Sequence, residues 1–183
     1  YNPKGLSGSK TGVFIGTEPT GYYGETFTGY SDAIIPSRLS YILNLKGPAI
    51  AINTGCSSSG VALHLACESL RNRETNMAIA GGVNACMDHN VQVRLDEIDM
   101  LSPKGRCNTF DAGGSGTIIS EGIGIVVLKR LEDAIASNDF IYGVICGSGT
   151  NQDGASNGIT APNGAAQEEL IVDVYEKYGI NPE

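Results

Sequence analysis

The sequence predicts an α/β fold in which mostly parallel strands and helices form layers. Short apolar runs of strand length alternate along the chain with longer segments that carry a helical pattern. Ala49–Ile52 is apolar at every position, as expected of a strand buried on both faces of a parallel sheet. With 183 residues, 41% of them hydrophobic, and no internal repeat or linker, the chain is expected to form one domain.

The first half of the chain supplies three of the predicted strands. Glycines and tyrosines between Thr17 and Tyr30 indicate a loop after the first strand. Gly47 and Pro48 end the helix that follows this loop, because proline cannot continue a helix. The elements predicted here are a strand at 11–16, helices at 34–45 and 61–70, and strands at 49–53 and 77–81.

The second half is expected to begin irregularly, because residues 88–110 are polar and contain Pro103 and Gly105. The glycine-rich stretch 113–124 lacks the spacing of a phosphate-binding loop and indicates tight turns instead. A strand at 124–129, a short helix at 131–137 and a strand at 141–146 are predicted next. The final helix has Asn163 as its candidate N-cap, Gly179 and Pro182 as its stop signals, and one apolar face made of Leu170, Ile171, Val174, Tyr175 and Tyr178.

Cys56 lies between a strand-like apolar segment and a helix that is apolar on nearly every face. A cysteine at this place is near a helix N-terminus, where unpaired N–H groups and the helix dipole favour the thiolate over the thiol. Cys56 is therefore the candidate nucleophile of the chain. The alternative is a buried structural cysteine in a serine-rich turn.

Charge and cysteine usage exclude several functional classes. A net charge of −8, without a cluster of basic residues, argues against binding to nucleic acid or to an anionic membrane and suits a solvated acidic surface. The five cysteines contain no C-x-x-C pair, so neither a metal site nor a redox motif is predicted. Their odd number, with no signal peptide or long apolar span, indicates reduced thiols and a cytoplasmic location. Four of them are read as small core or loop residues: Cys67, Cys86, Cys107 and Cys146.

Several segments, in one order along the chain, resemble a known family. NTGCSSSGVALHLACESL resembles the active-site segment of the β-ketoacyl synthases, the condensing enzymes of polyketide and fatty acid biosynthesis. AIAGGVNACM, MLSPKGRCNTFDAGGSG, SEGIGIVVLKRLEDA and GSGTNQDGASNGITAPNGAAQEE follow near the family's spacing, and the last resembles modular polyketide synthases. The resemblance implies a thiolase-like layered αβαβα fold. Residues 1–183 are then expected to be a single partial ketosynthase domain that lacks the family's first strands and its C-terminal half.

The resemblance also implies a reaction, a decarboxylative Claisen condensation. Cys56 matches the nucleophile that takes an acyl chain from the phosphopantetheine arm of an acyl carrier protein. A malonyl-type thioester then loses carbon dioxide, and its enolate attacks the acyl-Cys56 thioester. The backbone N–H of Cys56 is expected to be one donor of the oxyanion hole. The expected partners are the acyl carrier protein and a second copy of the chain in a homodimer, with no directly bound cofactor.

Two histidines and a lysine of the family do not have counterparts in this sequence. The histidines belong to HGTGT-like and NIGH-like motifs, neither of which is present. His64 lies inside the predicted helix and is read as structural, and no motif supports His89. These 183 residues alone are therefore expected to accept an acyl group at Cys56 at most, without condensation.

Four further residues match family positions near the substrate. Thr160 and Pro162 resemble residues at the entrance for the pantetheine arm, although a turn stabilised by Asn163 also accounts for them. Leu95 and Met100 match positions near the acyl pocket, although an adaptable core side chain is the simpler account of Met100.

Three functions are carried forward. The first is a fragment of an elongating ketosynthase, and the second is a non-elongating domain of the same fold that holds an acyl group or binds a carrier protein. The third is a dimerisation scaffold without catalysis, against which the presence of Cys56 argues.

Overall fold

The computed structural model describes residues 1–18 and 26–182, so most of the loop expected between Thr17 and Tyr30 lies outside the described residues. The described part alternates strands and helices, as predicted. Its elements are η1 (Pro3–Leu6), β1 (Thr11–Thr17), α1 (Phe27–Tyr30), α2 (Ile34–Leu43), β2 (Ala49–Ile52), α3 (Ser58–Arg71), β3 (Met77–Asn84), α4 (His89–Asp96), β4 (Gly122–Leu128), α5 (Leu131–Ala136) and α6 (Gly164–Tyr178).

The four strands form one sheet in the order β2-β1-β3-β4. β1 is central and pairs in parallel with β2 and with β3, so that Val13 lies opposite Ala49 on one side and Ile79 on the other. β4 pairs antiparallel with β3 and forms one edge of the sheet. The prediction of mostly parallel strands is confirmed, with an antiparallel edge strand added.

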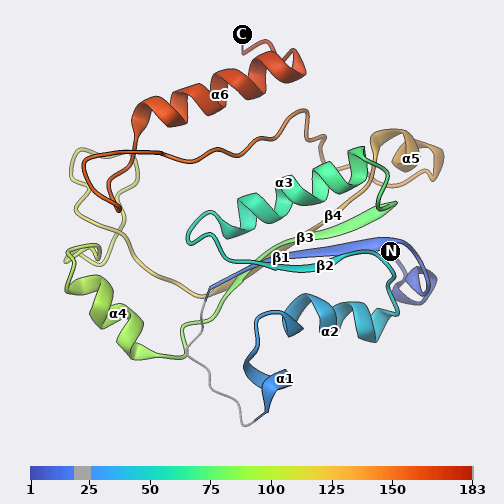
Figure 1. Cartoon of the computed structure of the whole chain (residues 1–183), viewed down its shortest axis with the longest axis horizontal. Helices are drawn as coiled ribbons and strands as arrows, with labels where there is room; N and C mark the ends of the chain where they lie inside the picture. The colour runs from blue at the N-terminus through green and yellow to red at the C-terminus, as the bar shows by residue number, and fades with distance from the viewer. Residues whose placement is uncertain (19–25, 183) are drawn as a thin grey trace.

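The two faces of the sheet are covered by different helices (Figure 1). Every residue of β1 is buried, because successive side chains of a strand point to opposite faces and both faces are covered. Phe14 packs in a cluster with Ala62 and Ala66 of α3, whereas Val13 and Ile15 belong to the cluster on the α2 side. α3 is less completely covered on its other sides, where Leu65 stays 37% exposed.

An extended segment (residues 141–150) and α6 lie beyond α3 (Figure 1). Ser148 of this segment hydrogen-bonds to α3, and Gly147 and Gly149 lie against side chains of α6. The order of layers is therefore α2, sheet, α3, extended segment, α6. The strand predicted at 141–146 is not formed, because no described strand lies beside it to make the ladder hydrogen bonds that define a strand.

Two helices differ from the sequence prediction. α4 forms within the stretch predicted to be irregular, and Asp88 caps it by accepting a hydrogen bond from the Asn90 N–H. In α6, the caps at Asn163 and Gly179 are confirmed. Its predicted apolar face is partly wrong, because Ile171 is 58% exposed and Tyr175 is 36% exposed.

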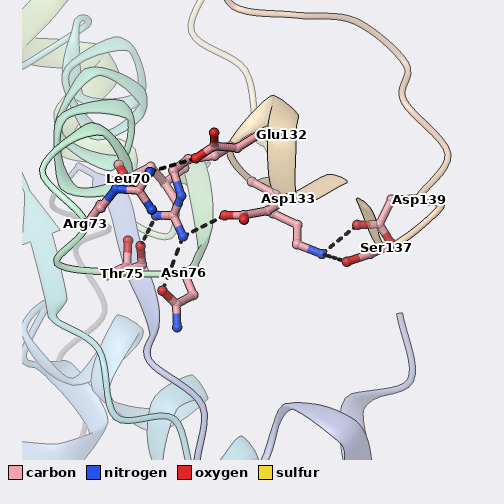
Figure 2. A network of polar contacts seen from close by, with 10 residues as sticks. Leu70, Arg73, Thr75, Asn76, Glu132, Asp133, Ser137 and Asp139 are labelled. Carbon is pink, nitrogen blue, oxygen red and sulfur yellow. Dashed lines mark hydrogen bonds and ion pairs between the residues drawn. The ribbon is translucent and has the colours of Figure 1, made fainter. Parts of the chain in front are cut away.

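Arg130, just before α5, forms hydrogen bonds to the turn between α3 and β3. Its guanidinium donates to the main-chain carbonyls of Leu70 and Thr75, at 3.0 and 2.7 Å. The same group forms an ion pair with Asp133 and a 3.3 Å hydrogen bond to the Asn76 side chain (Figure 2). The Leu70 carbonyl belongs to the last turn of α3, where carbonyls have no donor within the helix. It accepts from Arg130 and, at 3.2 Å, from the Arg73 N–H, so both groups cap the C-terminal end of α3.

Candidate active site

The turn that carries Cys56 joins the end of β2 to the start of α3. It lies at the carboxyl ends of the parallel strands, the edge at which open α/β sheets most often bind ligands. Cys56 is an exposed free cysteine two residues before the first residue of α3. The prediction that Cys56 lies near a helix N-terminus is confirmed, and the alternative of a buried structural cysteine is wrong.

Hydrogen bonds from side chains shape this turn, which we call the nucleophile turn (residues 53–58). The Asn53 side chain accepts from the Gly55 N–H at 3.2 Å. The Ser57 hydroxyl donates to the Thr54 carbonyl at 2.9 Å. The Ser58 hydroxyl donates to the Gly55 carbonyl at 2.6 Å and accepts from the Thr54 N–H at 2.9 Å. The turn also needs glycine at position 55, because that residue has φ +67°.

The first turn of α3 rests on glycines of the sheet. A Cβ on Gly16 of β1 would come within 2.5 Å of the Ser58 carbonyl carbon and the Ser59 nitrogen. A Cβ on Gly82 of β3 would come within 2.7 Å of the Ser59 Cβ. Real Cβ atoms do not approach other atoms so closely. The absence of a side chain at these two glycines therefore allows the first turn of α3, which follows Cys56, to pack directly on β1 and β3.

The neighbouring strand ends are tied together at the same edge of the sheet. Asn84, the last residue of β3, donates to the Ser120 carbonyl at 2.7 Å. The Cys86 N–H donates to the Glu121 carboxylate at 2.8 Å. These contacts fix the chain that leaves β3 to the chain that enters β4.

The interior of α3 holds a second thiol and a histidine. Burial raises the pKa of the Cys67 thiol, which disfavours the reactive thiolate there. His64 Nδ1 lies 3.1 Å from the Ser148 hydroxyl, and Arg71 donates to the same hydroxyl at 3.1 Å. His64 thus connects α3 to the extended segment, which agrees with the structural role expected for it.

The described residues offer neither a metal site nor a membrane span. No group of three or more His, Cys, Asp or Glu side chains in residues 1–18 and 26–182 is arranged to hold a metal ion. No helix in that part of the chain has both the length and the apolar character to cross a bilayer.

The four expected substrate-contacting residues fall on two segments. Leu95 is half-buried in α4, and the N–H of Met100 donates to its carbonyl at 3.0 Å, which fixes the turn after the helix. Thr160 and Pro162 are exposed in the loop before α6. The Ser156 hydroxyl donates to the Ala161 carbonyl between them. Among the described residues, no hydrogen bond or ion pair joins these four residues to the nucleophile turn, although α4 and the start of α3 lie toward the same end of the molecule (Figure 1).

Comparison with protein families agrees with this arrangement. Residues 1–134 match the N-terminal domain of β-ketoacyl synthase, and residues 142–183 match the C-terminal domain of β-ketoacyl synthase. The chain belongs to the β-ketoacyl synthase family. The C-terminal match covers the extended segment and α6, which are the two layers beyond α3.

Relatives of this ketosynthase chain are polyketide synthases. The chain is 48% identical over 190 residues to polyketide synthase PksL of Bacillus subtilis, which covers all of this chain and 4% of the relative. It is 44% identical to a phenolphthiocerol/phthiocerol polyketide synthase of Mycobacterium tuberculosis, over 99% of this chain and 12% of the relative.

A solved structure shares the fold of the whole chain. The ketosynthase from module 6 of the bacillaene synthase of Bacillus subtilis superimposes with a TM-score of 0.94 at 49% identity. That match covers 100% of this chain and 33% of the solved ketosynthase. The thiolase-like layered fold expected from the sequence is thereby confirmed.

Sequence reasoning missed the residues that support the nucleophile turn. Ser58, Gly16 and Gly82 position the backbone around Cys56, and none of them was expected to do so. The run of three serines was a usable signal for Ser58, because serine hydroxyls at a helix start often bond to nearby main-chain groups. No local signal marks Gly16 or Gly82, which contact the turn across long stretches of sequence.

Proposed function

We propose that this ketosynthase chain carries the acyl-accepting half of a decarboxylative condensation in polyketide biosynthesis, with Cys56 as the nucleophile. One observation supports this proposal most directly. Cys56 is an exposed thiol in the nucleophile turn, at the start of α3 and at the carboxyl edge of the sheet, in a chain of the β-ketoacyl synthase family. A helix start favours the negative charge of a thiolate, which is the reactive form.

The first step is acyl transfer onto Cys56. The thiolate attacks the carbonyl carbon of an acyl thioester, a new C–S bond forms, and the carbonyl oxygen becomes an oxyanion. In this proposal the Cys56 N–H donates to that oxyanion. The bond to the donor thiol then breaks, and the donor leaves as a thiolate that takes up a proton. The donor we propose is the phosphopantetheine arm of an acyl carrier protein.

The second step extends the acyl chain by two carbons. A malonyl-type thioester loses carbon dioxide, and the resulting enolate carbon attacks the acyl-Cys56 carbonyl. The C–S bond to Cys56 breaks, so the thiolate is regenerated and the β-ketoacyl product remains on its carrier. The family motifs that would supply histidines for decarboxylation are not among these 183 residues. The chain therefore supplies the site that holds the acyl group.

The remaining assignments follow from the same proposal. Thr160 and Pro162 would line the entrance for the pantetheine arm, and Leu95 and Met100 would limit the acyl pocket. We also propose a homodimer and a cytoplasmic location.

A Leu95→Phe substitution is expected to shift selectivity toward shorter acyl chains, measured as relative acylation rates across a thioester series. Val93→Phe on the same helix is the matched control, and unchanged selectivity in Leu95→Phe would refute the pocket assignment.

The experiment that tests the proposal compares the full-length protein with its Cys56→Ala variant. Each is supplied with an acyl thioester and a malonyl-loaded carrier protein, and both acyl-protein and β-ketoacyl product are followed by mass spectrometry. The proposal predicts acylation and product for the unchanged protein and neither for Cys56→Ala. Cys107→Ala, which removes another exposed thiol, serves as the control and should behave as the unchanged protein.

The same experiment separates the alternative functions. A non-elongating domain would acquire the acyl group on Cys56 and form no β-ketoacyl product. A dimerisation scaffold would show neither. Product formation by Cys56→Ala would exclude Cys56 as the nucleophile.

A further inference from the structure

We propose that Ser58 is a positioning residue for the oxyanion contact made by Cys56. This inference rests on the proposed function, because it concerns the acylation of Cys56. Ser58 acts through the peptide group that joins Gly55 to Cys56.

Ser58 holds the carbonyl end of that peptide group. Its hydroxyl donates to the Gly55 oxygen at 2.6 Å, and its main-chain N–H donates to the same oxygen at 3.0 Å. The hydroxyl also accepts from the Thr54 N–H at 2.9 Å. Because a serine hydroxyl has one proton to donate, these contacts fix the direction of its O–H bond. The Gly55 oxygen is thereby held toward the start of α3.

The geometry of a peptide bond transmits this contact to Cys56. The Gly55 carbonyl and the Cys56 N–H belong to one planar trans unit, in which they point in opposite directions. Holding the oxygen toward α3 turns the Cys56 N–H away from α3. In residues 1–18 and 26–182, no acceptor forms a hydrogen bond with that N–H. It is thus available to a developing oxyanion.

The surroundings of Ser58 keep this contact in place. Ser58 is 5% exposed, so water does not compete freely for its hydroxyl. Its backbone is close enough to Gly16 that an added Cβ would lie 2.5 Å away. Gly55 has φ +67°, and a glycine can adopt many backbone conformations, so a fixed partner is required to select one orientation of the peptide group that follows it.

Two reactions of Cys56 distinguish this role from a structural one. Alkylation by iodoacetamide displaces iodide from a saturated carbon and forms no oxyanion. Acylation by an N-acetylcysteamine thioester passes through an oxyanion. Loss of the Ser58 hydroxyl should therefore slow acylation without slowing alkylation, whereas general unfolding or a displaced thiol would change both rates.

The experiment measures both rates at Cys56 in the full-length protein, in Ser58→Ala and in Ser59→Ala, with the site assigned by peptide mass spectrometry. Ser59 is the matched control, because it is exposed in the same helical turn and its hydroxyl makes no hydrogen bond within the described residues. We expect Ser58→Ala to acylate about ten-fold more slowly or worse, given that loss of an oxyanion donor commonly costs about 10²-fold or more. Its alkylation rate and both rates of Ser59→Ala should stay within about two-fold.

Three results would overturn the inference while leaving the proposed function in place. Equal acylation rates in Ser58→Ala and the unchanged protein would show that the hydroxyl is not needed. A parallel fall in both rates would show that Ser58 acts on the thiol or on folding. Ser58→Thr, which keeps the hydroxyl, is the second variant if Ser58→Ala does not fold. It must retain the ratio of the acylation rate to the alkylation rate. A folded Ser58→Thr with a lower ratio would contradict the proposal. Failure of the unchanged protein to acylate at Cys56 would instead refute the proposed function and this inference with it.

Discussion

Single residues determine how closely α3 approaches the sheet below Cys56. Gly16 is the clearest case, because backbone atoms of Ser58 and Ser59 occupy the space that any side chain at position 16 would need. Gly60, the residue after Ser59 in α3, has open space where its Cβ would be. Two glycines near the same turn are therefore present for different reasons, and only Gly16 is required by packing.

Substituting these two glycines should have opposite effects on stability. Gly16→Ala forces the start of α3 away from β1 and is expected to lower the free energy of unfolding by about 1–3 kcal/mol. Gly60→Ala lies in a helix and is expected to raise it by up to about 1 kcal/mol. Chemical denaturation of both variants measures the difference. A Gly16→Ala variant as stable as Gly60→Ala would contradict the close contact.

Glu68 and Arg71 form a second residue-scale contact, on the far side of α3. They are paired at 2.7 Å, and Arg71 also stacks on the Tyr178 ring of α6, at 4.7 Å from its centroid. The hydrogen bond from Arg71 lowers the pKa of Glu68 below its usual 4.5. Since both side chains are about one-third exposed, the pair contributes little by itself, and its main effect is to orient Arg71 toward α6.

This pKa shift gives a pH dependence with a defined sign. A carboxylate whose folded pKa is lowered stabilises the folded state at pH values above its unfolded pKa, and this contribution is lost as the pH falls through the folded pKa. The Tm of the unchanged protein should therefore exceed that of Glu68→Gln at about pH 7, and the difference should shrink as the pH falls below about 4.5. Glu132→Gln removes a more exposed pair with Arg73 and is the control. A difference that grows on acidification would contradict the assignment.

At the scale of elements, α3 is fixed at both ends by different means. Its first turn rests on Gly16 and Gly82, and near its last turn Arg130 donates to the Leu70 carbonyl and to the Thr75 carbonyl just beyond the helix (Figure 2). Arg130 has a side chain that is only 15% exposed, whereas the nearby Arg73, paired with Glu132, is 68% exposed. A fixed C-terminal end matters for the site, because a rigid helix transmits its position to the nucleophile turn at its other end.

Replacing the two arginines separates a buried contact from a surface one. Arg130→Met removes the side-chain donor to the Thr75 carbonyl and the Asp133 carboxylate, and it leaves the Leu70 carbonyl with only the Arg73 N–H. It should cost about 2–3 kcal/mol of unfolding free energy. Arg73→Met removes an exposed ion pair and should cost at most about 1 kcal/mol. Equal losses of unfolding free energy for the two variants in urea denaturation would show that Arg130 does not stabilise the C-terminal end of α3.

At the scale of the whole molecule, β4 and the segment that follows α5 expose a broad apolar surface. They line an open groove together with residues of α3, and Ile125, Val127 and Val144 are among its side chains. β4 is exposed along nearly its whole length, although its sequence is apolar. Exposed apolar surface of this extent marks an interaction site or a liability to associate. The 183-residue chain spans 33% of the solved ketosynthase that it matches.

The purified 183-residue chain is accordingly expected to bind a hydrophobic dye such as ANS. Val127→Lys should reduce the fluorescence, because it places a charge in the groove. Phe110→Lys, at an exposed aromatic residue outside the groove, should reduce it much less. Equal effects of the two substitutions would mean that the dye does not report on the groove.

Most of the elements and the location of the candidate nucleophile could be predicted from the sequence, because they depend on residues close together in the chain. Cys56 could be placed because an apolar strand and a helix flank it closely in the chain. Asp88 is a capping signal for α4, but the polar residues around it favour an irregular segment, so the sequence did not predict this helix. The catalytic role of Cys56 stays a prediction, as do the substrate contacts of Leu95, Met100, Thr160 and Pro162.

What could not be predicted depends on contacts between distant segments. β4 pairs antiparallel with β3, although its own nearly continuous apolar run is typical of a buried parallel strand. Residues 141–146 have the apolar pattern of a strand, yet a strand also needs a neighbour for its hydrogen bonds. The fit of Gly16 beneath Ser58 joins positions far apart in the chain, which no local pattern reveals.

The most direct test of the central claim is to locate the acyl group after the protein reacts with an acyl thioester. Peptide mass spectrometry of the reacted protein should find the acyl mass on the peptide that contains Cys56, and Cys56→Ala should carry none. Acylation that falls instead on Cys86, Cys107 or Cys146, or acylation that persists in Cys56→Ala, would contradict the account.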